Sequence, residues 1–385
     1  MYGKEFEESL KAVAAAREAN IAYEPARMTA KEKEDLLAAY HPDYKKSEFE
    51  TLQIGPNKGE EVPKELALNV KWRMNALEAG AKDPAAAHAM LEMCRKDILF
   101  WFDTFAWTYD PRLKSRMVPF VTYPYQEDAI LDIKDAIETG YDVVIEKSRD
   151  MGASWLITGV STWFLEFSDL FSGLMVSRNE DYVDAPNDPK SLFWKIDFLM
   201  KNQPKWLSPK QVKRTSMHVG NVDRGSVIDG ESTTGEVGRG DRRSVVLLDE
   251  FGSFELKAGF NALASTRDTT NSRIINSTPK GTGNAFYKMA KESTAKIVRM
   301  HWSQHPVKSR GLYTSEKGED GRFVLKMLSD WKGIVSVRSR TDRTNRKVAF
   351  PEDYGVQRVS GGRSRVTAQG VEQPAEIAVH DPVER

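Results

Sequence analysis

The sequence contains little cysteine and no long run of apolar residues. Its 385 residues include one cysteine, Cys94, which excludes an intrachain disulfide framework, makes a cysteine-based zinc site untenable and fits a reducing compartment. Charged residues are scattered among the apolar ones over residues 1–20, so this stretch lacks the apolar core of a signal peptide. No uncharged apolar stretch reaches the roughly 18 residues that a membrane-spanning helix needs. We therefore expect an unexported protein without membrane association, with the cytoplasm as its default location.

The sequence also lacks net charge, because lysine plus arginine and aspartate plus glutamate both number 56. This balance favours neither a protein that binds polyanions over its whole surface nor an acidic scaffold. Any contact with DNA must therefore come from local patches. The candidates are two basic groups, Lys205, Lys210, Lys213 and Arg214 in one and Arg239, Arg242 and Arg243 in the other.

Three regions of different character follow one another along the chain. Residues 1–110 have a helical pattern interrupted by prolines, which predicts several short helices. Residues 111–310 alternate short apolar runs with amphipathic helices, which is typical of an α/β domain with a mainly parallel sheet. Residues 311–385 have the character of a linker and a tail, and from about Lys332 leucine is absent and no amphipathic period remains. This tail is predicted to be disordered, although a truncation or a reading-frame change in the gene would leave the same pattern.

Within the α/β region the expected elements are clear. Apolar runs predict buried strands at residues 143–145, 173–177, 245–248 and 273–276, with helices at 154–167, 188–201, 260–264 and 284–292. Residues 97–109, just before this region, are unusually aromatic. Because aromatic side chains dominate core area, we interpret them as a buried helix packed on the next domain rather than as a ligand site. Residues 225–243 are rich in glycine and arginine, which predicts a mobile, partly basic loop or hairpin.

The loop between the strand at 143–145 and the following helix has the context of a phosphate-binding loop, where backbone N–H groups and the positive helix end meet phosphates. Compared with G-x-x-x-x-G-K-[ST], it keeps Gly152 and the hydroxyl of Ser154, but Lys147 replaces the first glycine and Ala153 replaces the lysine. This match alone is weak. The candidate nucleotide-binding residues are Lys147, Ser148, Arg149, Asp150, Met151, Gly152, Ala153 and Ser154.

Two cations of this loop suit a triphosphate. Lys147 lies at the mouth of the loop, from which its side chain can reach back to the β- and γ-phosphate oxygens. The guanidinium of Arg149 can bind the γ-phosphate bidentately. Arg149 is therefore also a candidate catalytic residue, as an arginine finger supplied in cis.

Two acids follow the buried strand at 245–248. Ligands of open α/β sheets bind at the carboxyl ends of the strands, which is where Asp249 and Glu250 emerge. Asp249 is predicted to hold Mg²⁺ together with Ser154, and Glu250 to orient and polarise the attacking water. Because neighbouring residues on a strand point to opposite faces, one acid can serve the metal and the other the water.

Two further polar elements complete the set of candidate residues. Ser277 and Thr278 follow the strand at 273–276, and we expect them to sense the γ-phosphate and couple its loss to the parts that grip DNA. Gln126 could hydrogen-bond the edge of adenine, and Tyr123 or Tyr125 could stack on its ring. Each element is ambiguous alone, and the interpretation depends on their order and spacing.

Together these motifs resemble the ATPase half of the large subunit of tailed-phage terminases. The resemblance covers roughly residues 94–313 and is carried by residues 123–126, 147–154, 235–250 and 276–284, with flanks at 100–112 and 301–306. It implies an α/β fold of the P-loop (ASCE/RecA-like) NTPase class with a mainly parallel β-sheet, preceded by an α-helical N-terminal region. It also implies an ATPase, with ATP and Mg²⁺ as cofactors, that threads double-stranded DNA into an empty capsid.

The resemblance further implies partners and a location. The partners are the portal protein of the procapsid, a small terminase subunit that recognises the DNA, and further copies of the chain in a homo-oligomeric ring. The location is the host cytoplasm, and the protein is not expected to be a stable component of the virion. One departure is Ala153, where many relatives carry lysine. A second departure concerns the ribonuclease-H-like nuclease domain that the family usually carries after the ATPase. The tail of this sequence contains acids, but no predicted buried strands that would hold them as a metal-binding cluster. We carry over no nuclease residues and expect no nuclease activity.

Two alternatives and one histidine pair complete the sequence reading. A superfamily-2 helicase-like translocase shares these motifs, but the residues after Gly283 show no pattern of a second RecA-like domain. A truncated, non-catalytic terminase fragment is the other alternative. His301 and His305 have the spacing of some zinc ligands, but Trp302, Pro306 and the lack of a third ligand favour structural roles.

Overall fold

The computed structural model describes residues 49–51, 61–64, 66–112, 116–233, 237–238, 241–305 and 308, together with short strands between residues 313 and 367. The chain divides into two compact units. The first consists of residues 1–147 with 152–299, and the second of residues 148–151 with 300–385. Within the described residues, no helix combines the length and the apolar character needed to cross a membrane.

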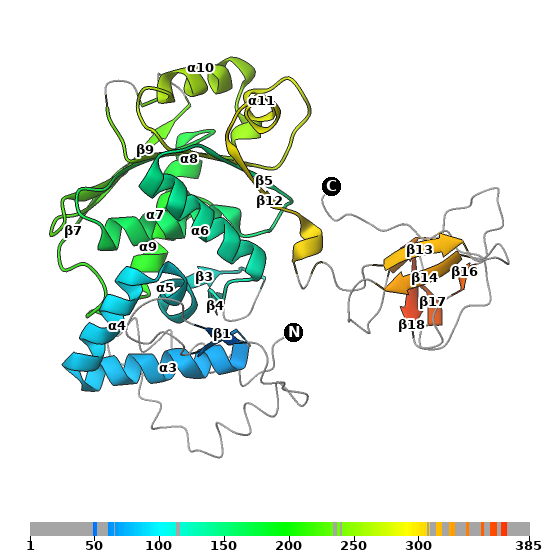
Figure 1. Ribbon diagram of the computed structural model, residues 1–385, viewed down its shortest axis with the longest axis horizontal. Coiled ribbons are helices and arrows are strands. Elements are labelled where there is room, and N and C mark those ends of the chain that lie inside the picture. The colour runs from blue at the N-terminus through cyan, green and yellow to red at the C-terminus, as the bar shows by residue number, and fades with distance from the viewer. Residues whose placement is uncertain are drawn as a thin grey trace. The chain divides into compact units, whose positions relative to one another are not determined.

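A sheet of eight strands forms the centre of the first unit (Figure 1). The order of its strands is β12 (Lys296–Met300), β5 (Val143–Lys147), β11 (Arg273–Ser277), β10 (Val245–Asp249), β6 (Ser172–Ser177), β9 (Ser226–Ser232), β8 (His218–Asn221) and β7 (Val212–Thr215). From β5 to β9 neighbouring strands are parallel, whereas β8 and β7 continue the sheet antiparallel. The predicted α/β fold with a mainly parallel sheet is therefore confirmed.

Helices cover both faces of this sheet (Figure 1). One face carries α10 (Leu256–Thr266) and α11 (Ala285–Glu292), and the other carries α6 (Pro124–Thr139), α7 (Ala153–Phe167) and α9 (Leu192–Lys201). A strand enclosed on both sides must be apolar throughout, and the four apolar residues that begin β10 are fully buried. The strands and helices predicted from the apolar runs are all present, with ends shifted by a few residues.

The N-terminal helices add a layer beyond α6 and α7 (Figure 1). They are α3 (Leu66–Lys82), α4 (Pro84–Lys96) and α5 (Ile98–Phe105). Two short antiparallel pairs accompany them, β1 (Phe49–Thr51) with β2 (Glu61–Pro63) and β3 (Trp107–Tyr109) with β4 (Met117–Pro119). The described residues of this region are thus mostly but not wholly helical. It lies in the same compact unit as the sheet, and the division of the chain at residues 110 and 310 stays a prediction.

The aromatic segment is buried, as the sequence predicts. Helix α5 places Phe100, Trp101, Phe102 and Phe105 almost entirely out of contact with solvent. The helix ends at Phe105, earlier than expected, because Trp107–Tyr109 pairs with β4 instead of continuing the helix. This segment therefore joins the N-terminal layer to the helices that cover the sheet.

The glycine-rich stretch differs from the prediction. We expected a loop or hairpin over residues 225–243, but Ser226–Ser232 forms β9, which pairs in parallel with β6 and antiparallel with β8. Gly230 makes this possible, because a Cβ there would lie 2.6 Å from Val183 and 2.9 Å from Phe193. Glycine in this strand marks close packing by neighbouring side chains rather than a turn. Residues 234–236 and 239–240 lie outside the described residues.

The second unit contains short strands. They are β13 (Tyr313–Lys317), β14 (Phe323–Met327), β15 (Ser336–Arg338), β16 (Val348–Ala349), β17 (Gly355–Val359) and β18 (Arg363–Thr367). β14 pairs with β13 and β16, and β18 pairs with β15 and β17. The last four strands lie where the sequence predicts disorder, and β17 and β18 include β-branched residues, which are enriched in strands. The rest of the tail falls outside the described residues.

One glycine sets the distance between α5 and α7. A Cβ added to Gly159 of α7 would lie 2.5 Å from Cζ and 2.6 Å from Cε1 of Phe102, and Phe102 is fully buried. A phenyl ring in a packed core has little room to withdraw. Only glycine therefore permits this approach of the two helices.

We expect Gly159→Ala to destabilise the protein by about 1–3 kcal/mol, because overpacking exceeds the gain in helix propensity. Chemical denaturation followed by tryptophan fluorescence would measure the change. Adding Phe102→Leu to Gly159→Ala should recover part of the loss, since the shorter side chain makes room. If Gly159→Ala is as stable as the wild type, the close approach of the two helices does not depend on glycine.

Candidate active site

The predicted site residues come from three neighbouring strands that end at one edge of the sheet. β11 lies between β5 and β10 and is parallel to both. The carboxyl ends of β5 and β10 carry Lys147 and Asp249, and Ser277 ends β11. Because parallel strands end at the same edge, residues more than a hundred positions apart in the sequence meet there.

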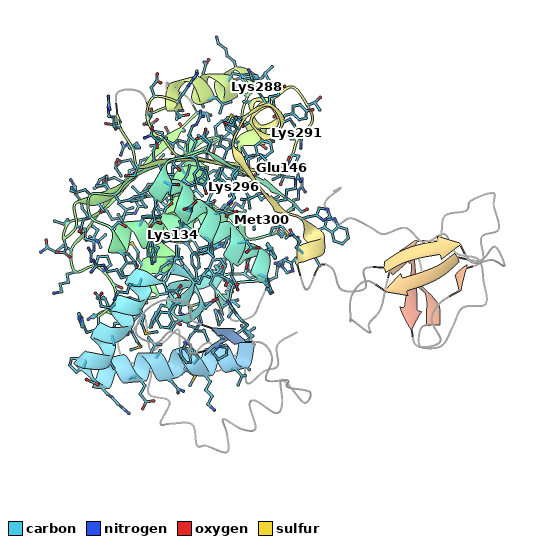
Figure 2. All side chains as sticks on the ribbon, viewed as in Figure 1. Lys134, Glu146, Lys288, Lys291, Lys296 and Met300 are labelled. Atoms are coloured by element: carbon cyan, nitrogen blue, oxygen red, sulfur yellow. The ribbon has the colours of Figure 1, made fainter. Side chains whose placement is uncertain are left out.

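Lys147 forms an ion pair with the second acid of the Asp-Glu motif. Its Nζ lies 2.8 Å from Glu250 Oε1 and 3.3 Å from the Thr278 hydroxyl. The Lys147 side chain is 8% exposed and that of Glu250 is 34% exposed. Glu146, one residue earlier on β5, instead pairs with Lys291 of α11 (Figure 2). This alternation along the strand directs only Lys147 into the site.

Ser154 in the first turn of α7 donates to the first acid of the motif. Its hydroxyl lies 3.1 Å from each carboxylate oxygen of Asp249. On the other side, the Asn276 amide donates to Asp249 Oδ1 at 2.5 Å. Asp249 is thus fixed between two donors in a nearly inaccessible position.

Burial raises the pKa of the Asp249 carboxyl above its usual range, and the charge of Glu250 raises it further. Lys147, Asn276 and Lys195 act in the opposite direction and stabilise the carboxylate. Burial also lowers the pKa of Lys195 to about 8, against the charges of Asp249 and Asp188. The site therefore brings two carboxylates together, and the nearby lysines and the Asn276 amide offset their charge only in part.

The start of α7 suits an anion. Gly152 precedes the helix with φ +82°, a backbone conformation that favours glycine, and no side chain caps the first N–H groups. A Cβ on Gly152 would lie 2.8 Å from Nε2 of Gln126, so only glycine leaves room for that amide. Uncapped N–H groups at the positive end of a helix are a common site for phosphate. Gly152 and the first N–H groups of α7 therefore fit a phosphate group.

Gln126 faces this turn from α6. Its Oε1 accepts a hydrogen bond of 3.0 Å from the N–H of Tyr123, which fixes the amide so that Nε2 is turned toward Gly152. The rings of Tyr123 and Tyr125 are stacked with centroids 5.9 Å apart. The geometry places the Gln126 amide beside Gly152, and its role in binding adenine stays a prediction.

Glu250 and Ser277 belong to one tight arrangement. Glu250 has φ +51°, and the turn that follows it, η2 (Phe251–Ser253), packs against the end of β11. There the Gly252 N–H donates to the Ser277 hydroxyl at 3.0 Å, and a Cβ on Gly252 would lie 2.8 Å from the same atom. A change at the end of β11 would therefore act directly on the turn that holds Glu250.

Four residues of the predicted loop belong to the second unit. These are Ser148, Arg149, Asp150 and Met151. Within that unit the Ser148 N–H donates to the carbonyl of Met300 at 3.0 Å, and the Trp302 N–H donates to the Ser148 hydroxyl at 3.2 Å. Their contacts with phosphate, including the finger role of Arg149, stay predictions.

The comparisons with known proteins concern the fold. No protein-family model matches the chain, and no curated protein matches it. Among solved structures, it is similar to the large terminase of bacteriophage HK97, with 16% identity, a TM-score of 0.40, and coverage of 53% of this chain and 43% of that one. It is also similar to the ATPase domain of the Thermus phage P74-26 large terminase, with 17% identity, a TM-score of 0.35, and coverage of 46% of this chain and 83% of that one. A third similar structure is a large terminase from a thermophilic bacteriophage in complex with ADP, with 10% identity, a TM-score of 0.36, and coverage of 65% of each chain.

The chain thus spans less than half of the HK97 large terminase and just under two thirds of the ADP-bound one. The identities are 17% or lower in all three cases. The similarity is one of mixed α/β architecture, and the chemistry has to be argued from the residues themselves.

Sequence reasoning missed two residues of the site. Asn276 could have been noticed, because an amide at the end of an otherwise apolar buried strand needs a partner. Lys195 gave no such signal, since a lysine on an amphipathic helix is usually exposed. It is in fact buried, and its ammonium donates to the carbonyls of Lys190 at 2.7 Å and Ser191 at 3.0 Å.

Two arginines of the basic patches proposed for DNA form ion pairs within the protein. Arg214 is bound to Asp184 at 2.7 Å and to Asp197 at 3.0 Å, and Arg243 is bound to Asp229 and Asp241. These ion pairs occupy both guanidinium groups within the protein, and a role of either arginine in DNA contact stays a prediction. Arg239 lies outside the described residues. The remaining members, Lys205, Lys210, Lys213 and Arg242, are exposed.

The histidine pair lies in the second unit. The His301 N–H donates to Gln304 at 2.9 Å, in the turn η3 (Trp302–Gln304), and its ring lies 5.3 Å from that of Trp302. In the part of the chain that the structure describes, no three His, Cys, Asp or Glu side chains gather around a possible metal position. An Mg²⁺ ion requires less of the protein, since it binds through one or two carboxylates and completes its shell with water and substrate phosphate.

The burial of Asp249 predicts a cost in stability. A carboxyl group whose pKa is raised on folding contributes fully below its unfolded pKa, and this contribution is lost as the pH rises through the folded value. Asp249→Asn removes the charge, so we expect the variant to melt above the wild type at about pH 8, with a difference that shrinks toward about pH 4. Differential scanning calorimetry would measure both. Asp128→Asn, at an exposed position of α6, serves as the control, and equal behaviour of the two variants would contradict the prediction.

Proposed function

We propose that this chain is an ATP-hydrolysing subunit of a phage terminase motor that packages DNA. The observation that carries the proposal is the meeting of Lys147 and Ser154 with Glu250 and Asp249 at the carboxyl edge of the sheet. A cation, a hydroxyl and two acids around an uncapped helix start are the groups that phosphoryl transfer from a nucleotide requires.

In this proposal the N–H groups at the start of α7 hold the phosphates of ATP, and Lys147 neutralises the β- and γ-phosphate oxygens. Asp249 and Ser154 would hold Mg²⁺, which when bound neutralises charge that develops on the phosphates. Asn276 keeps the Asp249 carboxylate in place through its 2.5 Å hydrogen bond. Gln126 and Tyr123 contact the adenine, with the Gln126 amide supplying the hydrogen bond.

Glu250 is the proposed catalytic base. The attacking water bonds to the γ-phosphorus, the bond to the bridging oxygen of ADP breaks, and the proton of the water passes to the Glu250 carboxylate. Because Lys147 now pairs with Glu250, binding of the triphosphate would draw the ammonium toward the phosphates and leave the carboxylate able to accept a proton. Arg149 is proposed to stabilise the transition-state charge as a finger in cis.

Coupling to movement is assigned to the end of β11. Thr278 shares the ammonium of Lys147, and Ser277 holds the turn after Glu250. Loss of the γ-phosphate would let Lys147 return to Glu250 and change the hydrogen bonds of both residues. These contacts support Ser277 and Thr278 as the elements that report hydrolysis to the rest of the motor.

The assignment to a terminase rests on the order of the motifs along the sequence. A motor of this kind acts on double-stranded DNA in the host cytoplasm, docks on the portal protein of the procapsid, receives DNA from a small terminase subunit and works as a homo-oligomeric ring. Sequence-blind phosphate contacts from exposed lysines such as Lys205, Lys210 and Lys213 would serve to grip the duplex. We assign no nuclease activity to this chain.

We expect Lys147→Ala to weaken ATP binding by about 10- to 100-fold, the value of a charged hydrogen bond in a protected site. Isothermal titration with a non-hydrolysable ATP analogue and Mg²⁺ would measure the loss. The matched control is Lys291→Ala, which removes an exposed lysine that pairs with Glu146 on the adjacent position of β5. Unchanged affinity of the Lys147 variant would exclude it as the substitute for the missing loop lysine.

We expect Glu250→Gln to lower the DNA-stimulated rate of ATP hydrolysis by about 10²- to 10⁴-fold while ATP still binds, because the amide cannot accept the proton. Phosphate release in the presence and absence of duplex DNA would measure the rate. A chain that binds nucleotide but has no Glu250-dependent turnover would be the non-catalytic fragment instead. Hydrolysis stimulated only by single-stranded nucleic acid would favour a helicase.

A further inference from the structure

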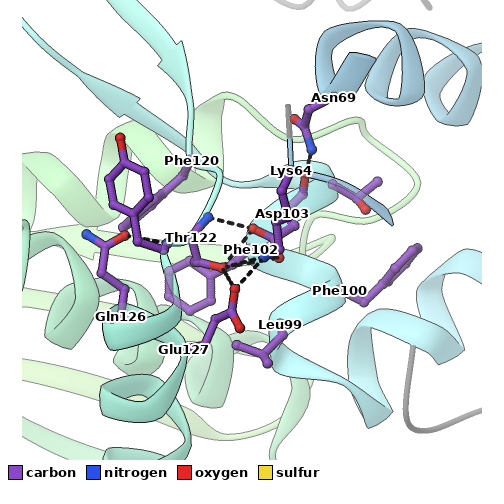
Figure 3. A network of polar contacts seen from close by, with 12 residues as sticks. Lys64, Asn69, Leu99, Phe100, Phe102, Asp103, Phe120, Thr122, Gln126 and Glu127 are labelled. Carbon is purple, nitrogen blue, oxygen red and sulfur yellow. Dashed lines mark hydrogen bonds and ion pairs between the residues drawn. The ribbon is translucent and has the colours of Figure 1, made fainter. Parts of the chain in front are cut away.

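A buried polar network joins the N-terminal region to the start of α6 (Figure 3). Its centre is Lys64, which directly follows β2. The Lys64 ammonium bonds to the Asp103 carboxylate, to the Thr122 hydroxyl at 2.9 Å and to Glu127 Oε1 at 2.7 Å. A lysine ammonium has three hydrogens, enough to donate to each of these three acceptors.

Asp103 of α5 holds the residue that precedes Tyr123. Its side chain is fully buried, and it accepts the Thr122 N–H at 2.7 Å and the Thr122 hydroxyl at 2.9 Å. Glu127, the other acid bound to Lys64, lies in the first turn of α6. Lys64 thus clamps the two sides of the segment that contains Tyr123 and Gln126.

This clamp continues to the phosphate-binding turn through hydrogen bonds. Thr122 fixes the backbone that leads to Tyr123, whose N–H binds Gln126 Oε1 at 3.0 Å. The other end of that amide faces Gly152. The direction in which Gln126 presents its donor and acceptor therefore depends on the backbone that Lys64 holds in place.

Other residues also attach the N-terminal region to α5, so this attachment does not depend on Lys64 alone. The Asn69 amide binds the carbonyls of Pro63 and Asp103 at 2.9 Å each. Arg73 is completely buried and donates to the carbonyls of Ala106 at 2.6 Å and Phe102 at 3.0 Å. Lys64, by contrast, also contacts Thr122 and Glu127 at the start of α6, besides Asp103 of α5.

We propose that Lys64 is a positioning residue that sets the base selectivity of the nucleotide site. It draws the Asp103 and Glu127 carboxylates together, and Gln126 then faces the purine with its amide in a fixed direction. Without the ammonium, two like charges would remain close together, and the start of α6 would shift to separate them. This inference rests on the proposed function, since it assigns the base-recognising side of the same site.

The test compares ATP, GTP and tripolyphosphate, each with Mg²⁺, as ligands of the full chain. Tripolyphosphate has no base and reports the phosphate-binding turn alone. In Lys64→Met we expect ATP binding to weaken by about 10-fold or more, the loss of a well-placed hydrogen bond. Tripolyphosphate affinity should stay within about twofold. The preference for ATP over GTP should fall together with the ATP affinity.

Two further variants guard against loss of folding. Lys64→Met combined with Glu127→Gln removes the repulsion between the two carboxylates that would shift the start of α6, so this variant should fold and regain part of the preference for ATP over GTP. Lys82→Met, which removes an exposed lysine paired with Glu78 in the same region, should leave all three affinities unchanged. Circular dichroism would confirm that each variant is folded.

The outcomes separate the two proposals. A folded Lys64 variant that keeps its preference for ATP, or that loses ATP and tripolyphosphate equally, overturns the role of Lys64. A wild type that binds ATP no better than tripolyphosphate also overturns it, while leaving the phosphate site intact. A wild type that binds neither ligand contradicts the proposed function itself.

Discussion

The site depends on one ion pair at the edge of the sheet, between Lys147 and Glu250. Each residue ends or follows a different strand, and β11 separates the two strands. Their side chains can meet at 2.8 Å only because β5, β11 and β10 are parallel and in register at this edge. The pair also gives a reason for a lysine at the first position of the loop. From the end of β5 the Lys147 ammonium reaches Glu250, which follows β10, directly. A lysine at position 153 would start from α7 and would approach Glu250 from another side.

This arrangement is held at a cost to stability. Asp249 is almost inaccessible, and its neighbour Glu250 carries a charge of the same sign, so ionising it is unfavourable in the folded protein. Ser154, Asn276 and the buried ammonium of Lys195 offset this only in part. A buried carboxyl whose pKa is raised beside a second acid is typical of functional sites, which agrees with the role proposed for Asp249.

The sequence was sufficient where a residue's environment follows from its neighbours in the chain. Continuous apolar runs such as residues 245–248 predict strands enclosed on both faces, and the acids after them must then lie at a strand end. It was insufficient where the environment comes from distant segments. Gly230 looked like part of a loop because the side chains of Val183 and Phe193 that require it are remote. The ion pairs of Arg214 could not be predicted, because its partners, Asp184 and Asp197, lie on other elements.

The contacts of the N-terminal layer also could not be predicted from neighbouring residues in the chain. Composition separates residues 1–110 from the sheet, yet α5 approaches α7 at Gly159 and holds Thr122 through Asp103. Both contacts end on segments of the candidate site, since α7 carries Ser154 and Thr122 precedes Tyr123. A helix packed this closely cannot shift without moving the start of α6 or the helix that follows the phosphate-binding turn. The N-terminal layer is therefore part of the framework that fixes the candidate site, and its buried aromatic residues determine how rigidly that framework is held.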